Sequence, residues 1–291
     1  MTEGVLGIIA CPMLDDNLVY SLSKDSEKKE IVIVRNEHNG SLVKKLDKFG
    51  IPYSYIDWGV VVNGGYKPVE NTYNILILMI DLGLHSKPKE LKEKVEDLSR
   101  KMKPSVDAFG YYLGTCGNYA WNIPQWCTDT LGKPAAMFCD ENGCLCDDCV
   151  GVAIAGGPRY LQMQKKYPGH FYLFPAMATN FDDFMDADQA DSAAIEASMT
   201  DEMREQLGIE PGRDGYLRWL LRMGDYKNIL KINTGLGEPD DYEIYAKKVA
   251  ERTALNIIEA EEGWASMQPT DDIYAKCKSF LKQYLYYPYC D

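Results

Sequence analysis

Cysteines are the residues of this sequence best suited to chemistry, because a thiolate is both a nucleophile and a metal ligand. The chain of 291 residues contains nine of them, and four lie within the stretch CDENGCLCDDC between Cys139 and Cys149. The odd number argues against a framework of disulfides. Only three histidines are present, which excludes a histidine-rich metal site.

Short apolar runs alternate with amphipathic segments along the chain. The runs predict strands at residues 5–10, 30–34, 53–57, 73–80, 106–114, 170–175, 228–233 and 255–260. Helices are predicted from about residue 15 and at residues 40–50, 87–102, 214–224, 239–254 and 270–287, with Ser41 as the N-cap of the second. Strands that alternate with helices indicate parallel βαβ units.

We therefore expect an α/β protein with Rossmann-like parallel sheets, helices on both faces and a mainly helical insertion near residues 181–225. The chain would form a single unit over residues 1–291, or two Rossmann-like lobes of about 1–105 and 106–291. An aromatic C-terminal tail, FLKQYLYYPYC, could pack on another subunit of a homo-oligomer.

Composition excludes several classes of protein. The net charge of −13 leaves no basic footprint for nucleic acid, and no apolar run is long enough to span a membrane. The N-terminus lacks a basic region and a signal-peptide core, so we expect a cytoplasmic protein. Neither a Walker motif nor a GxGxxG loop is present.

Three cysteines stand at positions where α/β proteins place their sites, beyond the carboxyl ends of strands. Cys11 follows the first predicted strand, Cys116 follows a later one after a brief turn, and Cys149 precedes VGVAIAGG, which is typical of a buried helix. We expect the three thiols to lie near one edge of the sheet. Nearby helix N-termini would lower their pKa and favour the thiolate.

Three convergent thiolates suit a metal centre with one open coordination position. Zn²⁺ held by three protein ligands leaves the fourth position for water or substrate, and a cubane iron–sulfur cluster held by three cysteines leaves one iron free. The alternative is that Cys11 and Cys116 are small buried hydrophobic residues, as free cysteines often are.

An ordered set of fragments resembles the DUF1638 family, an uncharacterised group of bacterial and archaeal proteins. The fragments are IACPML, LGLHSKP, YYLGTCGN, DDCVGVAIAGGPRY, YPGHFYL and INTGLGEPDDYEIYAKKVAE, and together they cover about residues 5–262. The family pattern matches Cys11, His85, Cys116, Gly117, Asp148 and Cys149. The resemblance implies that the three cysteines form a set, and an association of some members with corrinoid-dependent methyl-transfer systems.

The approach to Asp148 departs from the family pattern. Members usually have a shorter segment there that is poor in cysteine, whereas this chain adds Cys139, Cys144 and Cys146. Their spacing is not that of a standard zinc ribbon or ferredoxin. These thiols could hold a second metal, supply a fourth ligand, relay disulfide exchange, or simply face solvent.

Two further residues have alternative roles. His85 precedes a predicted helix and could act as an acid–base group or a ligand, or could be a loop histidine bonded to the backbone. Asp148 could cap the helix that follows and orient a thiolate partner.

Three functions follow from these residues. The first is a metal–thiolate protein, with zinc or an iron–sulfur cluster, that transfers a methyl group or sulfur to or from a small-molecule substrate, with a corrinoid protein or methyltransferase as partner. The second is a metal or cluster carrier or assembly factor without catalysis. The third is a metal-free cysteine hydrolase or transferase, which needs a histidine such as His85 beside a thiol.

Overall fold

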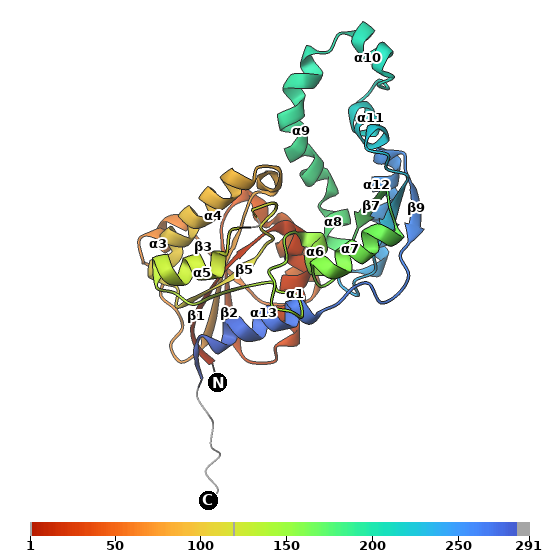
Figure 1. Cartoon of the computed structure of the whole chain (residues 1–291). Coiled ribbons are helices and arrows are strands. Elements are labelled where there is room, and N and C mark those ends of the chain that lie inside the picture. Colours follow the sequence, from red (N-terminus) through yellow and green to blue (C-terminus); the bar gives the residue numbers. More distant parts are fainter. Residues whose placement is uncertain (1, 119, 284–291) are drawn as a thin grey trace, which may run out of the picture. The chain divides into compact units, whose positions relative to one another are not determined.

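The structure is a computed structural model that describes residues 2–118 and 120–283, with the backbone alone described for residues 186–194 and 283. The chain divides into two compact units (Figure 1). Unit 1 comprises the residues up to Gly156 and those from Met267 onward, and unit 2 comprises Gly157–Ser266. The lobe boundary near residue 105 that the sequence suggested lies inside unit 1. The tail beyond Gln283, with Cys290, lies outside the described residues.

Unit 1 is built on a parallel sheet, so the predicted α/β fold is confirmed. Its strands run in the order β3-β2-β4-β1-β5-β6, and all neighbours in this order pair in parallel. The strands are β1 (Thr2–Ala10), β2 (Lys29–Val34), β3 (Ser54–Ile56), β4 (Tyr73–Met79), β5 (Ala108–Tyr112) and β6 (Ala135–Met137). A short strand, β10 (Lys282–Gln283), pairs antiparallel with β1.

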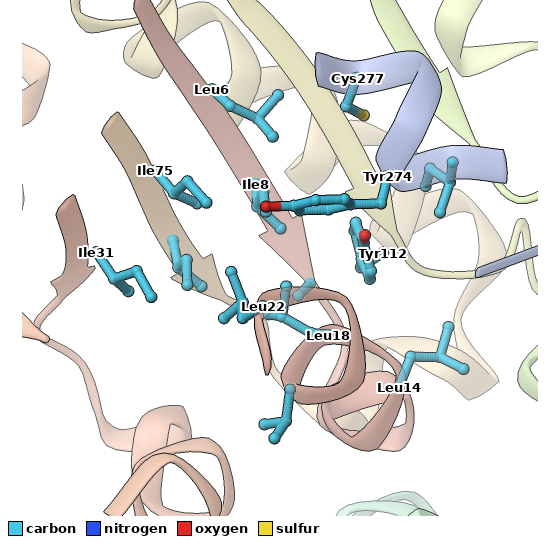
Figure 2. Packing of buried hydrophobic residues seen from close by; sticks show 14 of the residues in the cluster. Leu6, Ile8, Leu14, Leu18, Leu22, Ile31, Ile75, Tyr112, Tyr274 and Cys277 are labelled. Carbon is cyan, nitrogen blue, oxygen red and sulfur yellow. The ribbon is translucent and has the colours of Figure 1, made fainter. Parts of the chain in front are cut away.

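Helices cover both faces of this sheet. One face packs against α1 (Asp15–Lys24), α2 (Gly40–Lys48), α6 (Cys149–Ala153) and α13 (Gln268–Ser279). The other packs against α3 (Trp58–Val62), α4 (Pro88–Met102) and α5 (Ile123–Trp126). Figure 2 shows the first face, where Leu18 of α1 and Tyr274 of α13 lie over Ile8 of β1. Alternate residues of each strand point to opposite faces, so a central strand such as β4 is buried along its whole length.

Connections leave neighbouring strands toward opposite faces. The chain passes from β1 to α1 on the first face, whereas it passes from β4 and β5, which flank β1, to α4 and α5 on the second face. Such reversals open crevices at the carboxyl edge of a parallel sheet, where ligands bind in this class of fold. The end of β1, at Cys11, therefore lies between two reversals.

Unit 2 has a smaller parallel sheet in the order β7-β8-β9, formed by β7 (His170–Leu173), β8 (Asn228–Lys231) and β9 (Asn256–Glu259). Its helices are α7 (Gly157–Lys166), α8 (Pro175–Thr179), α9 (Phe181–Ser198), α10 (Asp201–Leu207), α11 (Gly215–Met223) and α12 (Pro239–Thr253). The helices α9 to α11 confirm the predicted helical insertion. Among the described residues, no helix combines the length and apolar character needed to cross a bilayer.

A buried charge cluster joins α1 to α2. The ammonium of Lys45 lies 2.5 Å from Asp15 Oδ1 and 2.7 Å from Asp16 Oδ1, and both carboxylates are buried. The prediction that Ser41 caps α2 is wrong: Asn39 precedes the helix, and the Ser41 hydroxyl donates to Asp15 instead. The ammonium of Lys45 compensates negative charge that the packing of α1 on α2 takes out of water.

Replacing Asp16 should change how the stability of the protein depends on pH. Burial raises the pKa of Asp16 to about 6, with Asp15 adding to the shift and Lys45 opposing it. The folded protein binds the proton of this carboxyl more tightly than the unfolded chain does. Protonation therefore stabilises the fold fully at pH values below the ordinary pKa of 3.8, and this contribution is lost as the pH rises through 6. Between pH 4 and 7 the stability of Asp16→Asn relative to wild type should therefore rise by roughly 1–3 kcal/mol in urea unfolding.

The exposed Asp47 of α2 provides a control for this measurement. The difference in unfolding free energy between Asp47→Asn and wild type should show no comparable rise over the same pH range. A pH-independent difference for Asp16→Asn would contradict the expectation.

Candidate functional site

Cys11 lies where β1 ends. Its backbone N–H donates to the carbonyl of Tyr112 at 2.9 Å, which fixes the end of β1 beside the end of β5. The residue then leads into a short 3₁₀ turn, η1 (Pro12–Leu14), and into α1. The first strand therefore delivers this thiol to the carboxyl edge of the sheet.

Cys116 lies in the turn that follows β5. Its backbone is in the left-handed region, with φ of 48°, and Gly117 follows with φ of 90°. Asp147 holds this turn: its carbonyl accepts from Cys116 N–H at 2.7 Å, and its carboxylate accepts from Gly117 N–H at 3.2 Å and from the Thr115 hydroxyl. A non-glycine residue in this conformation is uncommon and is held only where the surroundings fix it.

Gly114 lets the cysteine-rich loop approach the end of β5. A β-carbon at this position would lie 2.5 Å from the Asp147 carbonyl oxygen and 2.6 Å from the α-carbon of Asp148. Both are backbone atoms, so a larger residue would push the two segments apart. This close approach places the segment that precedes Cys149 against the turn that holds Cys116, although 33 positions separate the two cysteines in the sequence.

Cys149 is the first residue of α6, and Asp148 caps that helix. The Asp148 carboxylate accepts from Gly151 N–H at 2.6 Å, as predicted for an N-cap. Burial raises the pKa of Asp148 despite this bond. A role of Asp148 in orienting a thiolate partner stays a prediction.

The thiols of Cys11, Cys116 and Cys149 influence one another electrostatically. Burial raises the pKa of Cys11 and of Cys116 to about 12, and raises that of Cys149 well above its ordinary value. The charge of Cys11 adds to the shift at Cys116, and the charges of both add to the shift at Cys149. Each thiol therefore lies within electrostatic range of the others.

The expectation that helix starts would favour the thiolate is wrong. Desolvation is the largest cause of the pKa shift at Cys11, Cys116 and Cys149, and it favours the neutral thiol. A hydrogen bond from the Met13 amide lowers the pKa of Cys11, but by less than burial raises it. In the absence of a cation these three groups are protonated at neutral pH.

As the side chains stand, the described residues contain no group of three or more histidine, cysteine, aspartate or glutamate side chains arranged to hold a metal ion. The three thiols nevertheless suit such an ion by type, because a bound cation offsets both the desolvation and the mutual repulsion of thiolates.

His85 lies close in sequence to a segment that contacts the Cys116 turn. It belongs to a 3₁₀ turn, η3 (Leu82–Ser86), three residues before Pro88 begins α4. The Asn118 side chain donates to the carbonyl of Pro88 at 2.6 Å, so the start of α4 lies against the turn that holds Cys116. An acid–base or ligand role for the half-buried His85 stays a prediction.

The three additional cysteines form a second cluster on a tight hairpin. Cys139 pairs with Leu145, and the carboxylate of Asp140 accepts from the N–H groups of Asn142 and Cys144, each at 2.9 Å. Burial raises the pKa of Cys146 to about 12, and the charge of Cys139 adds to the shift. Cys144 is exposed whereas Cys146 is buried, so the three thiols differ in access to solvent.

A cavity of about 620 Å³ lies at the carboxyl ends of β2 and β4, and the sequence interpretation missed it. Its walls include Arg35 after β2, Trp58 at the start of α3 and Asp81 after β4. The charge of Asp81 is also one cause of the raised pKa of Cys11. The position of Arg35 and Asp81 directly after predicted strands was the signal available in the sequence.

Gly114→Ala should disturb the site and the fold together. Because the new methyl group meets backbone rather than a flexible side chain, we expect a loss of about 1–3 kcal/mol in the free energy of unfolding. Gly40→Ala is the control, since no atom lies within 4 Å of a β-carbon there. Equal free energies of unfolding for the two variants in urea would show that the space between Gly114 and Asp147 accommodates a methyl group, contrary to the prediction.

Comparisons with known proteins identify a family. The model of DUF1638, described as a protein of unknown function, matches residues 79–270, which is well over half of the chain. The matched range contains His85, Cys116, Gly117, Asp148 and Cys149 and begins after Cys11. No curated protein and no solved structure matches the chain. From the extent of the match, the chain belongs to the DUF1638 family.

Proposed function

We propose that Cys11, Cys116 and Cys149 form a metal–thiolate centre, with zinc or an iron–sulfur cluster held by three ligands and one coordination position open. The observation that supports the proposal is that three half-buried cysteines from three distant chain segments, after β1, after β5 and at the start of α6, lie within electrostatic range of one another.

The backbone around Cys116 supports a role beyond packing. Its left-handed conformation costs about 1 kcal/mol or more for a non-glycine residue, and such strain is concentrated at functional sites. Asp147 holds the strained turn through its carbonyl and its carboxylate. A metal ligand must present its thiol in a fixed direction, and that requirement accounts for the strained backbone.

The chemistry of a loaded site would differ from that of the free thiols. A bound metal keeps its thiolate ligands deprotonated and offers its open position to a small molecule. We propose the transfer of a methyl group or sulfur in one-carbon metabolism, with a corrinoid protein or methyltransferase as partner.

Metal content should depend on the three cysteines individually. After anaerobic purification we expect Cys11→Ser, Cys116→Ser and Cys149→Ser each to lose most of the zinc, or of the iron and its visible absorption, that wild type carries. Elemental analysis and the visible spectrum measure this, and circular dichroism verifies the fold of each variant. The apparent affinity should rise with pH, because uptake displaces protons from thiols of raised pKa.

Substitutions in the hairpin serve as matched controls. Cys144→Ser should retain its metal, because Cys144 is exposed and belongs to the second cluster. Loss of metal from Cys139→Ser and Cys144→Ser, with full retention in Cys11→Ser, would move the metal to the hairpin and refute the proposed centre. A wild-type protein that binds neither zinc nor iron would refute it as well.

Thiol alkylation discriminates between the metal centre and a metal-free cysteine enzyme. In metal-free protein at pH 8, iodoacetamide should modify Cys144 first and Cys11 and Cys116 far more slowly, because a thiol with a pKa of about 12 is ionised in about one molecule in ten thousand. Mass spectrometry of peptides measures the rates. Those of Cys11 and Cys116 should rise about tenfold per pH unit.

The same measurement tests His85. We expect His85→Ala to leave the alkylation rates of Cys11, Cys116 and Cys149 unchanged. Rapid modification of one of them at pH 7, abolished in His85→Ala, would indicate a histidine-activated nucleophile and favour the hydrolase or transferase without metal.

A further inference from the structure

The cavity beyond β2 and β4 has the form of a small-molecule site. Its volume of about 620 Å³ falls within the range of ligand pockets, about 300–1,000 Å³. Its apolar wall comes from the buried strand ends and from α4, through Val34, Leu78, Ile80 and Leu98. It lies in a crevice where β2 leads to α2 on one face and β4 leads to α4 on the other.

Negative charge predominates around this cavity. The carboxylates that line it are Glu37, Asp81, Glu90 and Glu93, against the two permanent cations Arg35 and Lys94. His38, 3.6 Å from a carboxylate oxygen of Glu37, adds a positive charge only when protonated. The lining therefore repels phosphate and carboxylate ligands and attracts cations.

The side chain of Arg35 makes its contacts with residues outside the cavity. Its guanidinium stacks over the ring of Tyr55, 4.3 Å from the centroid, and lies 3.6 Å from a carboxylate oxygen of Asp57. Neither Tyr55 nor Asp57 lines the cavity. The other cationic residue of the lining, Lys94, is exposed on α4, and its long side chain lets the ammonium group extend into solvent.

Trp58 supplies the aromatic wall. It is half-buried, packs against the core of the second sheet face and lines the cavity. Tryptophan is the aromatic residue that attracts cations most strongly through its ring face, and surrounding carboxylates add to that attraction. Aromatic and acidic groups together recognise methylated ammonium groups, which carry charge but have no N–H to donate.

We propose that this cavity binds a small organic cation of the methylated-ammonium class, held by the Trp58 ring and the surrounding carboxylates, with its apolar part on the strand ends. The cavity is larger than a bare ammonium group, so the ligand that fills it carries a further substituent. Binding itself requires no metal.

Calorimetric titration of metal-free wild-type protein tests the proposal. Choline should bind saturably, while its uncharged carbon isostere and inorganic phosphate should bind at least about five-fold more weakly, the factor expected for loss of a cation–π contact. Binding should weaken as salt rises, and choline should shift the indole N–H resonance of Trp58 in a ¹⁵N spectrum. Equal binding of the isostere, or tighter binding of phosphate, would overturn the proposal.

Variants locate the site. Trp58→Leu should weaken choline binding by about five-fold or more, and the exposed Glu90→Gln should weaken it without affecting the fold. Asp97→Asn is the matched control, because Asp97 is on α4 and pairs with Lys101 but does not line the cavity. Affinities unchanged in both Trp58→Leu and Glu90→Gln, or no saturable binding to wild type, would refute the proposal whatever the metal content of the cysteines.

Discussion

A parallel sheet must be covered on both faces, because its strands are apolar on both sides and its connections are helices. Unit 1 meets this constraint by sending the connections of neighbouring strands to opposite faces. The same alternation opens crevices at the carboxyl edge, one beside the thiol of Cys11 and one at the cavity beyond β2 and β4. The candidate sites are thus consequences of how the core is buried.

Most of the fold could be predicted from the sequence, because long apolar runs such as those of β1 and β4 have few alternatives to a buried strand. The strand β6 was missed, since three residues, Ala135 to Met137, are too short to show a period. The prediction that Ser41 caps α2 failed for a different reason. The Ser41 hydroxyl donates a hydrogen bond to the buried carboxylate of Asp15, which is distant in the sequence. Tertiary partners of this kind leave no local signal.

The candidate site was predictable in position but not in chemistry. The sequence predicted that Cys11 and Cys116 lie at the carboxyl edge of the sheet, because this placement depends only on where the preceding strands end. The sequence predicted a lowered thiol pKa, whereas the structure gives a raised one. The depth of burial that raises it depends on segments such as Asp147–Asp148, which pack against the site only in the folded protein. The cavity escaped notice since its lining comes from β2, α3, β4 and α4, whose side chains meet only after folding.

Unit 1 is discontinuous in the chain, and this affects the order in which it can form. The helix α13 supplies Tyr274 and Cys277 to the core over β1 and β5, yet it is synthesised after all of unit 2. A nascent chain therefore exposes the apolar groove that α13 later fills while residues 157–266 are still being added. During that interval the unfinished sheet exposes apolar surface, which favours association with other chains before α13 covers it.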